Sequence, residues 1–178
     1  MDLRIEKSEK AIRNAFLELR SKKPLEKITV KELCALSMIN KSTFYSHYQD
    51  IFDLSDTLEN EVIESILDSL SPEQQYIPGH PEAFTRGLCF AFMSHYSLTA
   101  TLFSGREQSR LTTMLEKGIK ERIFEKYPAY RDDTTQNIVL SYCIQGAYYA
   151  FINNRDTDIE TVIDVICNVN NAIGKLAE

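Results

Sequence analysis

The sequence predicts an all-α protein of about nine helices. Apolar residues recur with the helical period of three to four residues along the whole chain. No segment shows convincing alternation of apolar and polar residues at period two, the pattern typical of half-buried strands. Prolines, glycines and polar clusters separate the periodic segments from one another.

Three short helices are predicted within residues 1–49. The first has one buried apolar stripe, formed by Ala11, Ile12, Ala15, Phe16 and Leu19. The helical pattern then breaks at Pro24, because proline disfavours helix in the residue before it. A second helix is predicted to begin with a capping box, in which the Thr29 hydroxyl can accept a hydrogen bond from the Glu32 amide and the Glu32 carboxylate can accept one from the Thr29 amide.

The third helix is predicted at Lys41–Tyr48, after a tight turn and an N-cap at Asn40. Phe44 and Tyr48 are four residues apart, so they share one inward-facing stripe, which Ile39 in the turn joins. The remaining positions form outward-facing pairs: Lys41 with Tyr45, Ser42 with Ser46, and Thr43 with His47. No acidic residue occurs among them. These lengths are typical of a helix-turn-helix, whose second helix enters the major groove of DNA.

A longer amphipathic helix is predicted from Asp50 to about Leu70. We expect its carboxylates, including Glu59, to lie mostly on the solvated side. The clearest linker is the proline-rich segment "SPEQQYIPGHPE" that follows. Five further helices are predicted at about 82–96, 98–104, 107–126, 132–153 and 157–176. The sequence therefore predicts a first domain at 1–49 and a helical second domain at 50–178.

The last two predicted helices, at about 132–153 and 157–176, differ in kind from the others. The segment "IVLSYCIQGAYYAFI" is apolar nearly all round, which indicates burial on more than one side. Gly146 lies in the middle of this helix and destabilises it by roughly 1 kcal/mol relative to alanine, which a close helix–helix approach would offset. This pattern favours a symmetric dimer through these two helices; a central core helix in a monomer is the alternative.

Charge is distributed unevenly along the chain. Residues 1–49 carry ten Lys and Arg against six Asp and Glu, whereas residues 50–178 carry ten against twenty. The N-terminal part is therefore basic, although the net charge of the chain is −6. Such a split favours a basic module with an acidic partner domain, and a chance distribution is the alternative.

Several classes of protein are disfavoured. The sequence has no nucleophile elbow, no glycine-rich phosphate loop and no metal-type spacing of histidines, so we expect no enzyme, no metal and no cofactor. The four cysteines lack CxxC pairing and are interpreted as reduced, buried thiols. No apolar run is long enough to span a bilayer, and the N-terminus lacks the apolar core of a secretory signal. We therefore expect a cytoplasmic protein without membrane association.

The segment "AIRNAFLELRSKKPLEKITVKELCALSMINKSTFYSHYQDIFDL" resembles the DNA-binding region of the TetR family of bacterial transcriptional regulators. The most specific parts are "ITVKELC" and "INKSTFYSHY" followed by "DL"; the rest of the chain is similar only in its helix pattern. The resemblance implies a homodimer that binds a pseudo-palindromic operator in double-stranded DNA through its helix-turn-helix. It also implies a four-helix dimer interface from the last two helices. We expect a repressor, released from DNA by a small-molecule inducer.

The resemblance also implies which residues meet DNA: Thr29, Lys31, Lys41, Ser42, Thr43, Tyr45, Ser46 and His47. Lys41 and Ser42 would reach base edges or nearby phosphates, and Ser46 and Tyr45 are further candidates for reading bases. The other residues would contact the sugar-phosphate backbone. From the residues alone, a half-buried aromatic remains an alternative for Tyr45, and a solvated surface side chain remains one for His47.

A ligand pocket is predicted in the second domain, for a small apolar or aromatic molecule. Pockets of this kind are mostly apolar with a few polar groups. The candidate lining residues are Phe84, Cys89, Phe92, Met93, Tyr96, Phe103, Met114, Tyr142, Gln145 and Tyr149. Taken singly, each of these side chains is better explained by an ordinary helical core; taken together, the excess of Tyr and Met over Leu favours a cavity.

Two positions depart from the TetR pattern. The family commonly has glycine in the turn, where this chain has Met38, so we expect a strained or altered turn. It commonly has lysine at the start of the fourth helix, where this chain has Ile51, so we expect weaker non-specific affinity for DNA. The second departure keeps an alternative open: a protein–protein adaptor or coactivator that has this fold but has lost DNA binding.

Overall fold

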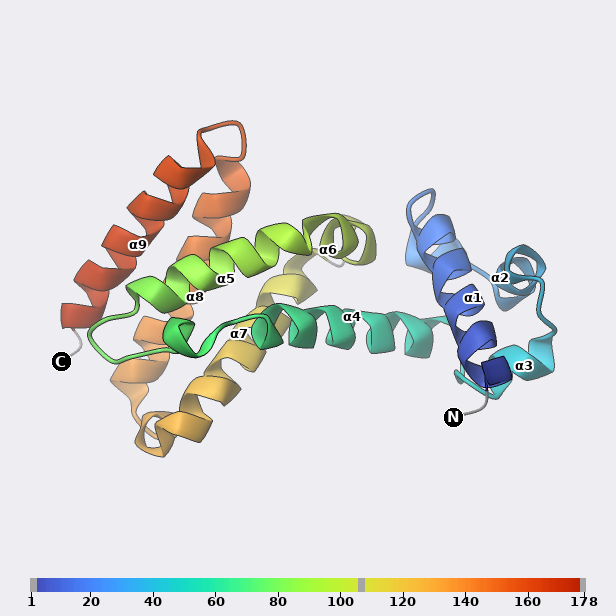
Figure 1. Ribbon diagram of the computed structural model, residues 1–178, viewed down its shortest axis with the longest axis horizontal. Coiled ribbons are helices and arrows are strands. Elements are labelled where there is room, and N and C mark those ends of the chain that lie inside the picture. The colour runs from blue at the N-terminus through green and yellow to red at the C-terminus, as the bar shows by residue number, and fades with distance from the viewer. Residues whose placement is uncertain (1–2, 106–107, 177–178) are drawn as a thin grey trace. The chain divides into compact units, whose positions relative to one another are not determined.

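The computed structural model describes residues 3–105 and 108–176 and confirms the all-α fold class (Figure 1). Within these residues there are nine α-helices and no strand. The helices are α1 (Leu3–Arg20), α2 (Val30–Ser37), α3 (Lys41–Tyr45), α4 (Ile51–Asp68), α5 (Glu82–Ser94), α6 (Tyr96–Leu102), α7 (Gln108–Lys126), α8 (Thr134–Asn153) and α9 (Ile159–Leu176). Single 3₁₀ turns occur at η1 (Leu25–Lys27), η2 (Pro72–Gln74) and η4 (Pro128–Arg131).

The third helix is shorter than the sequence predicts. It ends at Tyr45 rather than at Tyr48. The chain continues in tight turns, in which the amides of His47 and Tyr48 both donate to the Phe44 carbonyl, each at 3.0 Å. Tyr48 consequently keeps its predicted inward position although it lies outside the regular helix.

The chain divides into two compact units. The first comprises Met1–Val62 and Ser97–Gln108, and the second comprises Ile63–Tyr96 and Ser109–Glu178. Helix α4 belongs to both, and α6 is grouped with the N-terminal helices although it is distant in sequence. The assignment of separate functions to residues 1–49 and 50–178 stays a prediction.

In the first unit, α1 packs on α2 and α2 packs on α3. The predicted stripe of α1 is buried, apart from Ala11, which is partly exposed. The apolar side chains of the first unit with no exposed surface are Ile12, Phe16, Leu33, Phe44, Leu54 and Leu102 among the described residues. Burying a large apolar side chain contributes roughly 1.5–3 kcal/mol each, so this small core suffices to hold α3 in place.

A buried arginine joins α1 to the end of α6. The Arg20 guanidinium donates hydrogen bonds to the carbonyl oxygens of Leu102 at 3.1 Å and Ser104 at 3.0 Å. The last carbonyls of a helix have no partner within the helix and carry the negative end of its dipole, so a buried cation is stabilised there. Arg20 therefore fixes α6 as part of the first unit.

The expected solvated position of Glu59 is wrong. Glu59 has no exposed surface, and its Oε1 accepts a hydrogen bond from the Ser55 hydroxyl at 2.7 Å. Ser55 lies one helical turn before the buried Leu58, and Glu59 lies one turn before the buried Val62. Helix α4 therefore buries a wider face than its leucine spacing indicates.

In the second unit, α9 packs on both α5 and α8 (Figure 1). Helix α8 buries Leu140 and Phe151, whereas Ile138, Tyr142 and Tyr149 are exposed. The nearly all-round apolar character of α8 is thus only partly used within the chain. Among the described residues, no helix has the length and apolarity that a membrane crossing requires.

Candidate nucleic-acid interface and apolar cavity

The turn between α2 and α3 depends on a left-handed residue. Met38 has φ 55° and ψ 37°, and it is the one non-glycine residue with positive φ in the described part of the chain. The Ile39 amide donates back to the Cys34 carbonyl at 3.1 Å, which satisfies an otherwise orphan carbonyl at the end of α2. The turn therefore has the conformation that favours glycine, with methionine in its place.

At the start of α2, half of the predicted capping box is present. The Thr29 hydroxyl accepts a hydrogen bond from the Glu32 amide at 3.3 Å. The Glu32 carboxylate binds the Lys23 ammonium instead of the Thr29 amide. Lys31 is exposed on the outer face of α2. The ion pair removes Lys23 from the cations that are available to a phosphate.

Asn40 organises the start of α3. Its Oδ1 accepts hydrogen bonds from the Thr43 amide at 2.8 Å, the Ser42 hydroxyl at 2.9 Å and the Thr43 hydroxyl at 3.0 Å. The Ser46 hydroxyl donates to the Thr43 carbonyl at 2.7 Å. The hydroxyl protons of these three side chains are therefore engaged within α3, while their oxygens still present acceptor lone pairs.

The inward and outward directions of α3 are those predicted from its spacing. Phe44 has no exposed surface and Tyr48 is buried, whereas Lys41 and Tyr45 are exposed. The ring of Tyr45 meets that of Phe44 edge-on at 5.4 Å, and 56% of Tyr45 is exposed. Among the described residues, the Lys41 ammonium and the Tyr45 hydroxyl have no hydrogen bond or ion pair. They are consequently the exposed donors of this helix that are not engaged within the described part of the chain.

His47 is partly buried and is tied to α1. Its Nε2 lies 2.8 Å from the Ser8 hydroxyl. His47 is therefore not a fully solvated surface side chain. The contact with Ser8 orients its ring, which lies beside the ring of Tyr48. A phosphate contact from His47 would use the opposite ring nitrogen, Nδ1.

Ile51 is a core residue at the start of α4. It is 5% exposed, so its side chain is unavailable to solvent or DNA. The Asp50 carboxylate accepts from the amides of Phe52 and Asp53, each at 2.8 Å, and thereby caps α4. An acid-capped helix start thus stands where the TetR pattern commonly has a cation.

Ion pairs neutralise several other cations in the first unit. Arg13 donates to Glu9 at 3.2 Å and to Glu61 at 3.0 Å, and Lys22 pairs with Glu18 at 2.7 Å. Exposed pairs of this kind contribute little to stability, but they lower the local positive potential. Of the residues predicted to meet DNA, Lys31 and Lys41 remain as exposed cations outside these ion pairs.

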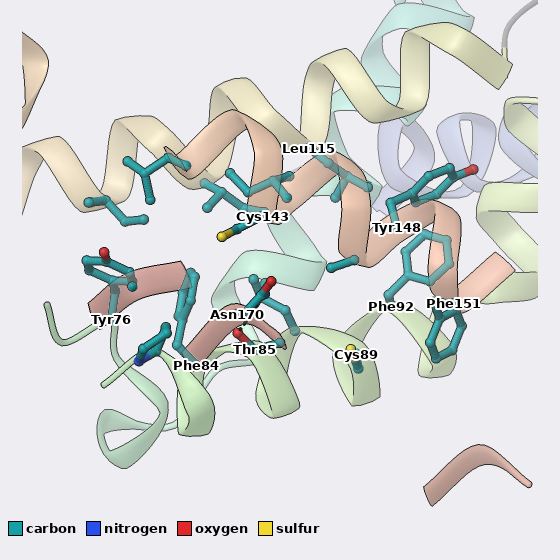
Figure 2. Close-up of a pocket in the computed structure, with 18 of the residues that line it drawn as sticks. Tyr76, Phe84, Thr85, Cys89, Phe92, Leu115, Cys143, Tyr148, Phe151 and Asn170 are labelled. Carbon is teal, nitrogen blue, oxygen red and sulfur yellow. Dashed lines mark hydrogen bonds between the residues drawn. The ribbon is translucent and has the colours of Figure 1, made fainter. Parts of the chain in front are cut away.

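The second unit contains an apolar cavity of about 100 Å³ (Figure 2). Its walls come from α4, α5, α7, α8, α9 and the segment that holds Tyr76. At one end, Phe92 meets Tyr148 edge-on at 5.7 Å and Phe151 at 5.9 Å. In the wall between α5 and α9, the Asn170 amide donates to the Thr85 hydroxyl oxygen at 3.3 Å.

All twenty residues that line the cavity are uncharged at neutral pH. Burial raises the pKa of the Tyr76 phenol and of the Cys89 thiol to about 12 in each case. Burial also raises the pKa of the Cys143 thiol above its ordinary value. These groups are therefore protonated at pH 7, and the two thiols lack the thiolate character that reactive cysteines need.

Of the ten predicted pocket residues, Phe84, Cys89 and Phe92 line this cavity. The remaining ones have other positions. Phe103 is buried in the first unit, Met93 and Tyr149 are exposed, Met114 is partly buried on α7, Tyr96 contacts Arg155, and Tyr142 and Gln145 line a separate open groove beside Lys120. These seven side chains are not brought together around one cavity.

Gln145 belongs to a polar bridge between α7 and α8. Its amide donates to the Glu116 carboxylate at 2.8 Å, and the Ser141 hydroxyl donates to the same carboxylate at 2.5 Å. Lys120 contacts Glu116 at 2.9 Å and donates to Ser141 at 2.7 Å. This arrangement gives Gln145 a structural partner.

Sequence reasoning missed Thr85, Tyr148, Phe151 and Asn170 as lining residues. A signal was present for Asn170, because it continues the buried stripe of Ile163 and Ile166 on α9. A polar residue at a core position of an otherwise apolar stripe indicates a buried hydrogen bond or a ligand contact.

No family model matches the chain, and no curated protein matches it. The resemblance to TetR regulators therefore rests on the helix-turn-helix residues and the helix pattern alone.

Proposed function

We propose that the protein is a dimeric, ligand-responsive DNA-binding regulator of transcription, acting as a repressor. The observation that carries this proposal is the division of α3: Phe44 and Tyr48 anchor it in the core, and Lys41 and Tyr45 are exposed with their donors unengaged. A helix held by so few anchors, with an acid-free outer face, suits insertion into the major groove.

The engaged hydroxyls refine the proposed roles on DNA. Ser42, Thr43 and Ser46 offer oxygen acceptors, which suit the amino groups of adenine or cytosine better than they suit a phosphate. Lys41 and Tyr45 offer donors, which suit phosphate oxygens or the acceptor edge of guanine. Thr29, Lys31 and His47 complete the proposed contacts to the sugar-phosphate backbone.

Dimerisation through α8 and α9 is part of the proposal. Ile138, Tyr142 and Tyr149 form one exposed stripe along α8, and Val165 and Val169 are exposed on α9. Gly146 lies in the α8 stripe, and a Cβ added to it would meet nothing within 4 Å. The close approach that would offset a mid-helix glycine is thus not made within the chain, which favours a second copy as the partner.

The proposed regulation is a population shift transmitted by α4. Ile66 of α4 lines the cavity, and Leu54 and Leu58 of the same helix are buried in the first unit. A ligand that displaces Ile66 would pivot α4. Such a pivot would change the separation of the two recognition helices from the ~34–36 Å that adjacent half-sites require.

DNA titration tests the function. The purified protein is titrated onto the DNA upstream of its own gene at two salt concentrations. We expect specific binding that weakens steeply with salt, since phosphate contacts release counterions. Lys41→Ala should reduce affinity about 5- to 150-fold, the range expected for losing roughly 1–3 kcal/mol.

Lys117→Ala is the matched control, because Lys117 is an exposed lysine of the second unit and its loss changes net charge equally. Equal effects of the two variants would show that Lys41 acts only through charge. Absence of binding above background at low salt would overturn the proposal. The buried Ile51 favours the adaptor interpretation in that event.

A further inference from the structure

The cavity of the second unit contains one hydrogen-bonded polar pair, Thr85 on α5 and Asn170 on α9. Both side chains are more than nine-tenths buried, with 5% and 7% of their surface exposed. Most of the other residues that line the cavity are apolar, with Leu88, Cys89 and Ile144 among them. Figure 2 shows the pair between the aromatic group at Phe92 and the ring of Phe84.

This pair uses only part of its hydrogen-bonding capacity. An asparagine side chain has two N–H donors and an oxygen acceptor, and a threonine hydroxyl has one donor and two lone pairs. One bond joins them, from the Asn170 amide to the Thr85 oxygen. This bond engages neither the Thr85 hydroxyl proton nor the Asn170 side-chain oxygen. A ligand in the cavity that carries a polar group of its own could use this remaining capacity.

The lining sets the charge of such a ligand. An ion transferred into a site without a counter-charge loses its hydration with nothing in exchange, so a charged ligand is excluded. None of the twenty lining residues supplies such a counter-charge. A neutral hydroxyl or amide group can accept from the Thr85 hydroxyl and donate to the Asn170 oxygen, whereas a carbonyl can use only the Thr85 donor.

The size of the cavity limits the ligand further. Its volume of about 100 Å³ is below the roughly 150 Å³ of an engineered cavity in another protein that holds benzene. A single six-membered ring therefore enters only if the walls yield slightly. Ile66 of α4 is one of those walls.

We propose that the cavity binds a small, neutral, ring-sized molecule with one uncharged hydrogen-bonding group, which Thr85 and Asn170 recognise while the Phe92 end holds the apolar part. This inference rests on the proposed function in treating the cavity as the regulatory site. It adds the chemical class of the ligand and the residues that select it.

Phenol and toluene form a suitable pair of probes, because they differ only by a hydroxyl in place of a methyl group. Binding of each to the full-length protein is measured by isothermal titration calorimetry without DNA. The variant is Thr85→Val/Asn170→Leu, which replaces both polar groups by apolar ones of similar shape and so leaves no orphan partner. We expect the ratio of the phenol to the toluene dissociation constant to rise about tenfold in the variant.

The control is Asn168→Leu, the same substitution at an exposed position of the same helix, which should leave the ratio unchanged. Benzylammonium, the cationic counterpart of benzyl alcohol, should bind at least tenfold more weakly than benzyl alcohol. An unchanged phenol-to-toluene ratio in the double variant would overturn the role of the pair. Failure of the wild-type protein to bind either phenol or toluene would overturn the ligand class.

A second arm separates this inference from the proposed function. The affinity for upstream DNA is measured with and without saturating phenol. In one outcome, phenol and toluene bind with the expected ratio of dissociation constants while phenol leaves the affinity for DNA unchanged. That result would contradict the proposed regulation of DNA binding and would support the proposed class of ligand. DNA release by phenol that persists equally in the double variant would retain regulation and remove Thr85 and Asn170 from recognition.

Discussion

Helix α3 and the apolar cavity differ in how their side chains are positioned. In α3, five helical residues between an N-cap and a tight turn determine which side chains face outward, so Phe44 is buried and Lys41 is exposed. The cavity is built from five helices that are far apart in sequence, and its lining combines positions such as Ile66 and Asn170. Local periodicity determines the first arrangement, and packing between distant helices determines the second.

The difference shows that local sequence determines which side chains of a helix are exposed, whereas the packing of several helices determines which side chains line a cavity. An outward-facing surface needs only a few anchors and a helical period. An interior cavity needs the relative rotation of each helix, which a change of one residue in register alters by about 100°. Three substitutions test these two kinds of arrangement: Phe44 and Met38 belong to the local one, and Glu116 belongs to the packing between helices. Their expected effects on the unfolding free energy decrease in this order.

The largest effect is expected at the anchor of α3. Phe44→Ala should destabilise the protein by about 3–5 kcal/mol, because it removes a fully buried aromatic side chain and leaves a cavity. Phe52→Ala is the control, since Phe52 is largely exposed, and it should cost far less. Urea unfolding followed by circular dichroism measures both. Similar costs for the two variants would show that α3 is not held by its single inward stripe.

A smaller effect of opposite sign is expected at the turn. Met38→Gly should stabilise the protein by about 1 kcal/mol, because it relieves a left-handed conformation that costs about 1–2 kcal/mol for a residue with a Cβ. Ala35→Gly, at an exposed interior position of α2, should destabilise by about 0.5–1 kcal/mol. Thermal unfolding of the two variants checks the signs. Destabilisation by both would place Met38 outside the left-handed region in solution.

The smallest effect is expected at the bridge between α7 and α8. Partial burial opposes ionisation of Glu116, but hydrogen bonds from Ser141, Gln145 and Lys120 outweigh it and hold the pKa of Glu116 below its ordinary value of 4.5. A carboxyl with a lowered folded pKa contributes stability that is present above its unfolded pKa and is lost as the pH falls through the folded value.

Glu116→Gln should therefore cost on the order of 1 kcal/mol at pH 7, and the difference from wild type should shrink as the pH falls below about 4.5. Glu125→Gln is the control, because Glu125 is an exposed acid on the same helix. Unfolding free energies at pH 7 and pH 3.5 measure the effect. A pH-independent difference would contradict the charged bridge, and with it the structural role of Gln145.

Much of the fold could be predicted from the sequence, because helical period and capping act locally. Asn40 and Pro24 mark where segments begin and end, and the boundaries of most helices lie within a few residues of those expected. The predicted end of α3 was wrong because Tyr48 is buried as expected, but the amides of His47 and Tyr48 bond to the Phe44 carbonyl in turns and not in a regular helix. The burial of Glu59 was missed because the leucine spacing of α4 indicates only one buried row, whereas Ser55 and Glu59 form a second buried row beside it.

The cavity could be predicted less well. The prediction assumed that aromatic and methionine side chains would gather around one space, but Tyr142 is 65% exposed and Phe103 is buried in the other unit. Sequence composition does not encode which face of α8 turns toward α5. Asn170, by contrast, carried a readable signal as a polar residue within an apolar stripe.

The Arg20 contact has a consequence for protein engineering. A fragment cut from this chain after residue 49, which corresponds to the proposed DNA-binding module, would lose the Leu102 and Ser104 carbonyls that Arg20 binds. Within that fragment the guanidinium would keep only the Lys23 carbonyl as an acceptor, at 3.4 Å, and it would lose the packing of α6 against it. A working chimera must therefore carry α6 with the first four helices, or replace Arg20 by an apolar residue such as methionine. The first unit is compact in space, but it is formed by two separate segments of the sequence, so both segments have to be transferred together.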